Sequence, residues 1–281
     1  MARTDALSIL SNQEQDQLAE VYGATIESIQ KMCLSEQIKN TNYSGTPTAG
    51  SVEIARFSNA VVADYGTARA AGEGTKIDNS GKVTININTH KEIVEEIEEI
   101  DLDLHGVKGI AQKRMGNQVK RISAYLDRLF FNKAKAEGTK LTIKEGTIVN
   151  RLEALIQSLE TTENKWVDGV DRDMLVLTLT PKVYSLIRDH LDIVTNPNID
   201  SSVNEFRTFR GVKVYSNHRQ TVDAICMIDG AIAQPVWYKK YDMQNIQMSA
   251  AIGLINFFSS GTKAVMPDLI KYVEDIQEEE E

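Results

Sequence analysis

Residues 51–57, "SVEIARF", and residues 82–89, "KVTININT", decide the fold of this chain. In both stretches apolar residues alternate with polar ones, which is typical of β-strands that expose one face to solvent. The alternating apolar residues are Val52, Ile54, Val83, Ile85 and Ile87. Residues 70–82, "AAGEGTKIDNSGK", lie between the two stretches and contain three glycines. We therefore predict a long hairpin with a mobile, glycine-rich tip.

The glycine-rich tip could alternatively be read as a phosphate-binding loop. Such a loop needs a helix directly after its glycines, so that backbone N–H groups and the helix dipole converge on the anion. Here a strand follows, and neither phosphate-binding glycine motif can be spelled. The hairpin interpretation is therefore favoured. Because an isolated two-stranded ribbon is marginally stable in water, we expect it to rest on its own body or on a neighbouring molecule.

A dense acidic segment follows the second strand and is followed by a basic one. Seven of the twelve residues from Glu92 to Asp103 are acidic, whereas residues 107–135 contain eight Lys or Arg and one acid, Asp127. The basic segment has helical periodicity and predicts an amphipathic helix of roughly 45 Å that ends at Gly138. The acidic run is either a solvated face or the counterpart of opposite charges on another copy. The basic helix could bind nucleic acid, although no aromatic residues interleave with its charges.

The remaining chain predicts helices at the N-terminus and α/β structure in the second half. A helix is expected over residues 11–39, with Ser11 and Glu14 as a capping box. A further helix starts at Thr147, and the buried strand in 173–179 leads into a helix with Thr180 as N-cap and Pro181 at its first position. Strands are expected in 212–217 and 224–238, with a hairpin turn at Asp229–Gly230. Residues 244–273 read as strand and turn, and 274–281 as a charged tail.

Composition restricts the class of protein. The 281 residues carry a net charge of −9 and 42% apolar residues, which suits one large domain or two intertwined ones. Cys33 and Cys226 each stand alone, so we expect no disulfide framework and a reducing compartment. No run of 18 apolar residues and no signal-peptide core is found, which predicts a soluble protein that is not exported by that route. The acidic balance argues against tight, sequence-independent binding to nucleic acid.

A search for chemistry in the sequence predicts no catalytic, metal-binding or cofactor-binding residue, and hence no enzyme. The four histidines have no second ligand at metal-binding spacing, and no nucleophile elbow, zinc-protease or C-x-x-C motif occurs. Residues 166–173, "WVDGVDRD", resemble a calcium loop only superficially, because the required glycine and distal glutamate are out of place.

Taken in order, these pieces resemble the major capsid proteins of tailed bacteriophages, whose Hong Kong 97-type fold is also used by encapsulins. The resemblance covers about residues 45 to 270. Its most specific part is the pairing of residues 51–57 with 83–104 around the glycine-rich tip, directly before the basic helix. Further pieces are "YLDRLFFNKA" at the end of that helix, "DMLVLTLTPKVYSLIRDHL" and "FRGVKVYSN".

The resemblance implies an α+β, Hong Kong 97-type capsid fold divided into consecutive segments. These are an N-terminal arm (1–47), an extended β-hairpin loop (48–104), a peripheral domain with a long spine helix (105–145), an axial domain (146–235), and a return to the peripheral domain with the C-terminal tail (236–281). In this family the extended loop lies across the adjacent subunit, which is the support that an isolated ribbon needs.

The resemblance also implies a structural function. The chain would assemble with itself as pentamers and hexamers into an icosahedral shell around double-stranded DNA, which it would not bind specifically. It would be found in the virion capsid after assembly in the host cytoplasm, with a scaffolding protein, a portal and decoration proteins as further partners and no membrane. Charge makes certain residues candidates for contacts between subunits: Arg56, Arg69, Lys76, Glu95, Glu96, Glu98 and Glu99. Lys76 also lies in the loop where some members form a lysine–asparagine cross-link, but no catalytic acid or partner asparagine can be assigned.

Three alternatives stay open at the level of sequence. An encapsulin compartment has the same fold, and the N-terminal segment does not settle the difference. A cytosolic enzyme with an unrecognised site would form a defined small oligomer. A DNA-binding accessory protein would shift free DNA in a salt-dependent manner.

Overall fold

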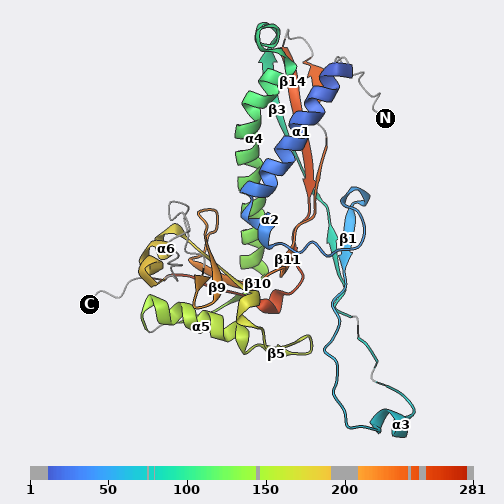
Figure 1. Ribbon diagram of the computed structural model, residues 1–281, viewed down its shortest axis with the longest axis vertical. Helices are drawn as coiled ribbons and strands as arrows, with labels where there is room; N and C mark the ends of the chain where they lie inside the picture. Colours follow the sequence, from blue (N-terminus) through green and yellow to red (C-terminus); the bar gives the residue numbers. More distant parts are fainter. Residues whose placement is uncertain are drawn as a thin grey trace, which may run out of the picture.

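The chain, seen here as a computed structural model, is described for residues 12–74, 76–78, 80–143, 146–190, 208–239, 242–246 and 251–276. It consists of an elongated body, a compact body at one end of it, and an outlying loop (Figure 1). Helices and mostly antiparallel strands are mixed, so the predicted α+β class is confirmed.

A long helix packed on a narrow sheet makes the elongated body. Strand β3 (Thr89–Glu98) pairs antiparallel with β14 (Ala251–Ser260) over ten residues. The short strands β12 (Val236–Tyr238) and β13 (Asp242–Asn245) pair with the other edge of β14. One face of this sheet is covered by α4 (Glu99–Glu137) and α1 (Asn12–Met32), and the buried contacts include Leu18, Ile97, Ile110, Val119 and Phe258.

Helix α4 confirms the amphipathic helix predicted over residues 107–135. Gly106 has non-helical backbone angles (φ 69°, ψ 162°) and separates the main helix from a short helical segment at 99–105. The main helix ends at Gly138 as expected. A side chain could not fit there, because a Cβ atom would lie 2.5 Å from the carbonyl oxygen of Ala134.

The N-terminal helix differs from the prediction. Instead of one helix over 11–39 there are two, α1 and α2 (Leu34–Ile38), with extended backbone at Cys33 between them. The start of α2 is stabilised by the carboxylate of Asp127, which accepts hydrogen bonds from the backbone N–H of Ser35 at 2.9 Å and of Leu34 at 3.4 Å. Ser11 of the predicted capping box lies outside the described residues.

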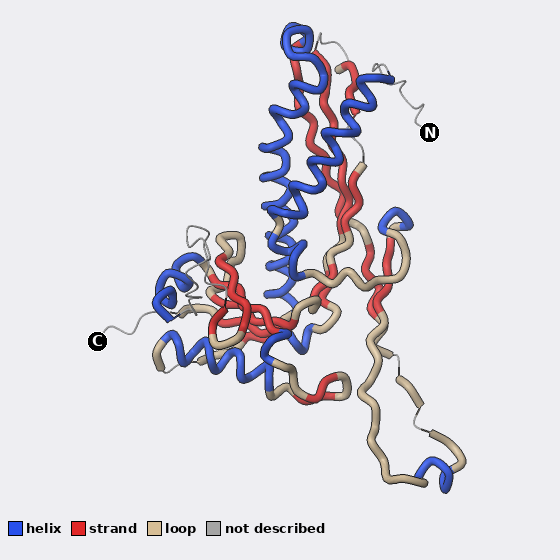
Figure 2. Tube along the Cα trace, in the orientation of Figure 1, coloured by secondary structure: helices blue, strands red, loops and turns tan. Residues whose placement is uncertain are grey.

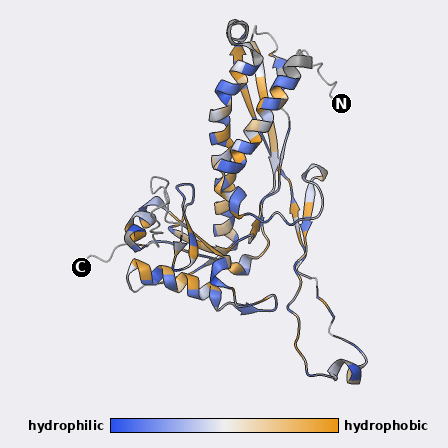
Figure 3. Ribbon diagram, viewed as in Figure 1, coloured by the Kyte–Doolittle hydropathy of each residue, from blue (hydrophilic) through white to orange (hydrophobic). Residues whose placement is uncertain are grey.

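The compact body is built on a six-stranded sheet. Its order is β4 (Thr139–Lys140), β16 (Ile270–Val273), β10 (Ala224–Ile228), β7 (Leu175–Leu179), β9 (Val212–Ser216) and β8 (Thr208–Phe209). Helices α5 (Ile148–Glu160) and α6 (Pro181–Ile187) cover one face. The other face packs on Phe130 and Phe131 near the end of α4. Every residue of β7 is buried, as predicted, and the hydrophobic strands of this sheet stand out in Figure 3.

Two local predictions in this body are confirmed and one is wrong. Thr147 caps α5 by accepting from Asn150 N, and Pro181 begins α6 after Thr180. A turn does form at Asp229–Gly230, but it does not connect a hairpin. Strand β11 (Ile232–Ala233) pairs with β15 (Lys263–Ala264), and β10 pairs with β7 and β16. The N-terminal segment holds this turn, because Gly230 N donates to Ile38 O and Asn40 N donates to Ile232 O.

The chain between residues 236 and 281 contributes to both bodies. β12, β13 and β14 belong to the elongated sheet, whereas β16 is the second strand of the compact sheet, between β4 and β10. The chain therefore crosses between the two bodies from α4 to β4 and again from β14 to β16.

The predicted hairpin forms only at its base. β1 (Ser51–Ile54) pairs antiparallel with β2 (Val83–Asn86), and Val52, Ile54 and Ile85 pack on Ala233 and Val265. The expected pairing of 51–57 with 83–104 is thus right for 83–86 and wrong for 89–98, which pair with β14. β14 offers β3 a ten-residue ladder and a hydrophobic face, which the short β1 cannot.

Residues 55–82, hereafter called the finger, project away from both bodies (Figures 1 and 2). The described finger residues are irregular chain except for the five-residue helix α3 (Thr67–Ala71), which lies near the far end. Glycines in left-handed conformation flank α3, with φ 98° at Gly66 and φ 70° at Gly72. The prediction of a regular ribbon up to the tip is therefore wrong beyond residue 54, since residues 58–66, "SNAVVADYG", do not alternate apolar and polar side chains.

Candidate inter-subunit surface

The finger exposes an unusual concentration of large apolar side chains. Among the described residues nine large apolar side chains are exposed, and five of them lie in the finger: Phe57 (56%), Val61 (66%), Val62 (97%), Tyr65 (95%) and Ile77 (80%). Fully burying one such side chain is worth about 1.5–3 kcal/mol. Five together, held in one protruding segment, form a surface that gains free energy when a partner covers it.

The two limbs of the finger enclose a hollow that adds shape to this apolar surface. It measures about 700 Å³ and is lined by residues of both limbs, among them Phe57, Ala60, Val61, Lys76 and Ile77. The lining is mostly apolar, and Lys76 is one of the lining residues. An apolar side chain from a partner could enter this hollow, since protein interiors close such gaps.

The base of the finger is held by a small hairpin of the compact body, β5 (Glu163–Asn164) and β6 (Val167–Asp168). Arg56 forms a two-pronged ion pair with Asp268, at 2.6 and 2.8 Å, and lies over the ring of Trp166. Asn164 donates to the same carboxylate at 2.7 Å. The backbone N–H of Asn59 donates to the carbonyl of Lys165 at 3.0 Å. We call this set of contacts the finger joint.

The second limb of the finger also enters the finger joint. The ammonium group of Lys165 pairs with the carboxylate of Asp78 and lies over the Trp166 ring. At Gly81 the limb passes so close that a Cβ atom would lie 2.8 Å from the carbonyl oxygen of Arg56 and 3.0 Å from the Trp166 ring. Both limbs are thus fixed at their base, while the outer part of the finger is exposed.

Two acids of the finger joint have pKa values below the ordinary range. For Asp268, burial raises the pKa, but the hydrogen bonds from Arg56 and Asn164 together with the Arg56 charge outweigh burial and lower it. The hydrogen bond from Lys165 lowers the pKa of Asp78 to about 2, helped by hydrogen bonds from Ser80. Both carboxylates are therefore ionised at neutral pH and hold their partners as charged pairs.

Three of the sequence-predicted interface residues belong to the finger. Arg56 is half-buried in the finger joint and has Asp268 as its partner. Arg69 is exposed on α3, where its guanidinium lies 5.9 Å from the centre of the Tyr65 ring. Lys76 is exposed and is one of the residues that line the hollow. Their role between subunits stays a prediction.

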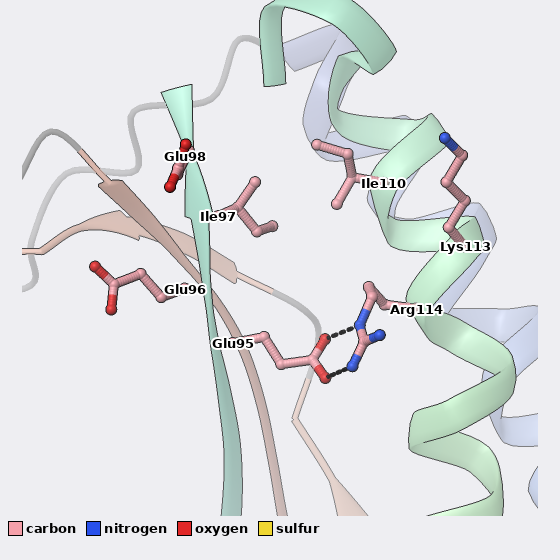
Figure 4. Close-up of a pocket in the computed structure, with 7 residues that line it drawn as sticks. All are labelled: Glu95, Glu96, Ile97, Glu98, Ile110, Lys113 and Arg114. Carbon is pink, nitrogen blue, oxygen red and sulfur yellow. Dashed lines mark hydrogen bonds and ion pairs between the residues drawn. The ribbon is translucent and has the colours of Figure 1, made fainter. Parts of the chain in front are cut away.

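The other four predicted residues are Glu95, Glu96, Glu98 and Glu99. They lie at the C-terminal end of β3 and the start of α4, away from the finger. Figure 4 shows Glu95 directed toward α4, where Arg114 donates to it at 2.6 and 2.9 Å, and Glu96 directed away from the helix. Gln118 also donates to Glu95, and the Arg114 hydrogen bond lowers the pKa of this carboxyl although burial opposes it. Glu98 is exposed, and Glu99 is the first residue of α4. Their role between subunits likewise stays a prediction.

The fold separates these two groups within one chain. The acidic end of β3 lies at the top of the elongated body in Figure 1, and the finger lies at the bottom, along the longest axis of the molecule. A contact between Arg69 or Lys76 and Glu98 can therefore only be made between two copies. Such a contact joins different surfaces of the two partners, which is the head-to-tail type that generates rings or filaments.

Sequence reasoning missed the apolar finger residues and the joint that fixes their base. The apolar residues in 57–66, "FSNAVVADYG", could have been noticed because they follow neither a period of 2 nor one of 3.6, so no folded face would bury them. The partners of Arg56 had no local signal, because Asp268 lies 212 residues away.

Within the described ranges, no group of three or more His, Cys, Asp or Glu side chains could hold a metal ion. Cys33 and Cys226 are buried, free thiols, and burial raises the pKa of each to about 12. No helix in the described part of the chain is both long and apolar enough to cross a membrane.

Comparison with known proteins identifies the fold. No family model and no curated protein sequence matches this chain. Solved structures do match. The capsid of the cyanophage P-SCSP1u is 12% identical, with 84% of this chain and 85% of that chain covered and a TM-score of 0.57. A structure from Mycobacterium phage Che8 is 15% identical, with 80% and 84% covered and a TM-score of 0.55.

A third match extends further along the chain. The virus-like particle from Pyrococcus furiosus is 13% identical and has a TM-score of 0.55, with 91% of this chain and 98% of that chain covered. Identities this low establish the fold and leave the function open. At the level of an α+β phage capsid fold the resemblance is confirmed: this chain has the fold of phage capsid structures.

Proposed function

We propose that this protein is a structural, non-enzymatic shell protein that assembles with itself into an icosahedral capsid around the double-stranded DNA of a tailed phage. The observation that carries the proposal is the finger, which exposes five large apolar side chains while its base is fixed to the body. A monomer gains nothing from this arrangement. A second copy that covers the finger would bury the apolar surface and supply the missing support.

The arrangement of charges supports repeated contacts of one kind. Arg69 and Lys76 on the finger and Glu98 on β3 lie at opposite ends of the molecule, so each copy offers both halves of a head-to-tail contact. Single exposed ion pairs are worth at most about 1 kcal/mol. Repetition around closed rings of five and six copies would give the contact its strength.

The parts of the chain take roles in this proposal that follow the resemblance. α4 is the spine helix, residues 146–235 of the compact body are the axial domain, and the finger is the outer part of the extended loop (48–104). The shell would be found in the virion after assembly in the host cytoplasm, with a scaffolding protein, a portal and decoration proteins as further partners.

The proposal is tested by expressing the full chain and examining it by electron microscopy and sedimentation. The wild-type protein is expected to form uniform hollow polyhedra of megadalton mass. The triple variant Phe57→Ser, Val61→Ser, Ile77→Ser is expected to remain small, because its finger offers little apolar surface. Far-UV circular dichroism should show unchanged secondary structure.

A matched control tests whether assembly depends on the finger or on exposed apolar side chains anywhere in the chain. Met32 (44%) and Met174 (51%) are exposed outside the finger, and the variant Met32→Ser, Met174→Ser should still form shells. A wild-type protein that stays a monodisperse dimer at every concentration contradicts the proposal. Particles purified from infected cells should contain nuclease-protected DNA, whereas an enzyme cargo would indicate the encapsulin alternative.

A further inference from the structure

The outward face of α4 carries a line of positively charged side chains that form no ion pair with the described residues. Eight Lys and Arg lie between residues 107 and 135. Four of them pair with acids of the same chain: Lys108 with Glu20, Arg114 with Glu95, Lys133 with Glu137, and Lys135 with Glu274. The other four are Lys113, Lys120, Arg121 and Arg128, hereafter called the cationic stripe. They have no acidic partner among the described residues, and all four are exposed.

The cationic stripe lies along one side of the helix. At 3.6 residues per turn, its four positions fall within an arc of roughly 100°, and they extend over about 22 Å of the helix axis. The opposite side of the helix is buried, because Val119, Ile122 and Leu126 pack against the sheet and α1. In Figure 1 the upper part of α4 has no other element beside it on the side away from α1.

The residues between the four cations decide what kind of partner fits. From residue 113 to residue 128 the same arc also holds Asn117 and Ala124, but no acidic and no large apolar side chain. A helical protein partner needs an apolar seam to bury, and this face offers none. A polyphosphate backbone needs only cations and room for close approach, which Gly116 and Ala124 leave open.

We propose that the cationic stripe binds the phosphate backbone of double-stranded DNA without reading its sequence. A 22 Å length of duplex carries on the order of a dozen phosphates, so four cations in line neutralise only a part of the facing charge. The binding is therefore weak but measurable for one copy, and it becomes strong where many copies face the same DNA. Insofar as it places α4 on the inner side of a DNA-filled shell, the inference rests on the proposed function.

The net charge of the protein agrees with such a restricted contact. The chain carries a net charge of −9, so most of its surface repels DNA. A cationic stripe on an otherwise acidic molecule confines the contact to one face of one helix. The elongated body would then lie along the duplex, since the cations are arranged parallel to its axis.

The experiment measures binding of a fluorescently labelled DNA duplex to the full-length, unassembled protein by anisotropy at several NaCl concentrations. The logarithm of the binding constant should fall with the logarithm of salt concentration by about 0.9 for each phosphate neutralised. The variant Lys120→Gln, Arg121→Gln, Arg128→Gln should lose about three units of this slope. The control variant Lys182→Gln, Lys213→Gln, Lys239→Gln makes the same change in net charge at exposed positions of other elements and should keep the slope.

Three outcomes overturn the inference. If both triple variants lose the same slope, or if the wild-type protein shows no salt-dependent binding, α4 is not a DNA-binding face. Poly-glutamate is the second probe: if it binds the wild-type protein at least as tightly as the duplex and the binding is lost in the stripe variant, the stripe takes an acidic polypeptide instead.

Electron microscopy of the stripe variant separates this inference from the proposed function. The stripe variant should still form shells, because the finger is unchanged. Shells that form normally but no longer retain DNA support the inference. A wild-type protein that binds the duplex through the stripe but forms no shells would refute the proposed function and leave the stripe assignment standing.

Discussion

Arg56 donates two hydrogen bonds, 2.6 and 2.8 Å long, to the two carboxylate oxygens of Asp268, which lies 212 residues further along the chain. Asn164 donates to the same carboxylate from the β5–β6 hairpin. Three segments that are distant in sequence therefore meet at the base of the finger. This joint sets the direction in which the apolar finger leaves the body, and it therefore determines where a partner must bind.

The first prediction concerns this ion pair. Asp268→Ala leaves the half-buried Arg56 guanidinium without its acceptor, which is expected to lower the free energy of unfolding by about 1–3 kcal/mol. Urea denaturation of the unassembled protein measures the change. Lys31→Gln removes an exposed pair with Glu27 and should change the free energy of unfolding far less. Equal losses in the two variants would show that the Arg56 pair is no stronger than a surface pair.

The second prediction concerns the buried carboxylate of Asp127, which joins three parts of the fold. Asp127 itself lies in α4. Its carboxylate accepts one hydrogen bond from Ser35 N at the start of α2 and another from the Arg219 guanidinium at 2.5 Å. Asp127→Ala should destabilise the protein by about 3–5 kcal/mol, because it leaves the Arg219 charge uncompensated. It should also expose the junction of α1 and α2 to protease before the rest of the chain.

Asp127→Asn tests whether charge or hydrogen bonding matters at this position. The amide oxygen can still accept from Ser35 N, so α2 should stay protected from protease while thermal stability falls. Cleavage at the α1–α2 junction in both variants alike would show that the Arg219 pair, not the backbone hydrogen bond, holds α2 in place.

The third prediction concerns pH. The folded-state pKa of Asp78 is about 2 and that of Asp268 is also lowered, against an ordinary value of 3.8. A depressed pKa contributes stability above the unfolded-state value, and that contribution is lost as the pH falls through the folded-state value. The finger joint should therefore loosen between about pH 4 and pH 2.

Trp166 reports on the finger joint, since Arg56 and Lys165 both lie over its ring. In a Trp237→Phe background it is the one remaining tryptophan of the chain, and its emission should change over this pH range. Asp78→Asn should reduce the amplitude of the change. Emission that stays constant down to pH 2, with far-UV circular dichroism also constant, would contradict the assigned role of the two acids.

The fourth prediction compares two glycines. A Cβ atom at Gly261 would lie 2.3 Å from the carbonyl oxygen of Asn86, so Gly261→Ala must push β14 away from β2 and should cost about 1–3 kcal/mol. Gly23 lies inside α1, with nothing within 4 Å of a built Cβ atom. Gly23→Ala should stabilise the protein by about 0.5–1 kcal/mol. Thermal unfolding measures both, and the same sign of change in both variants would contradict the packing described here.

Local features of the fold could be predicted because the residues that cause them are neighbours in sequence. Thr147 caps α5, Pro181 begins α6, and alternation in residues 51–54 and 83–86 makes paired strands. The amphipathic period of residues 107–135 gives α4, and Gly138 ends it. The order of these elements also carried the resemblance to the phage capsid proteins, whose fold the matched structures share.

The partners of strands and charges could not be predicted, because distant segments compete for them. β3 pairs with β14, about 160 residues away, since that ladder and its hydrophobic face exceed what β1 offers. The turn at Gly230 joins no hairpin, because its backbone forms hydrogen bonds with the N-terminal segment at Ile38 and Asn40. The sequence by itself determined which elements form and that one acidic and one basic block adjoin each other. Only the tertiary structure decided that Arg56 and Glu95 are paired within the chain, while five apolar side chains of the described finger residues stay exposed. Burial depends on contacts between residues that no local pattern brings together.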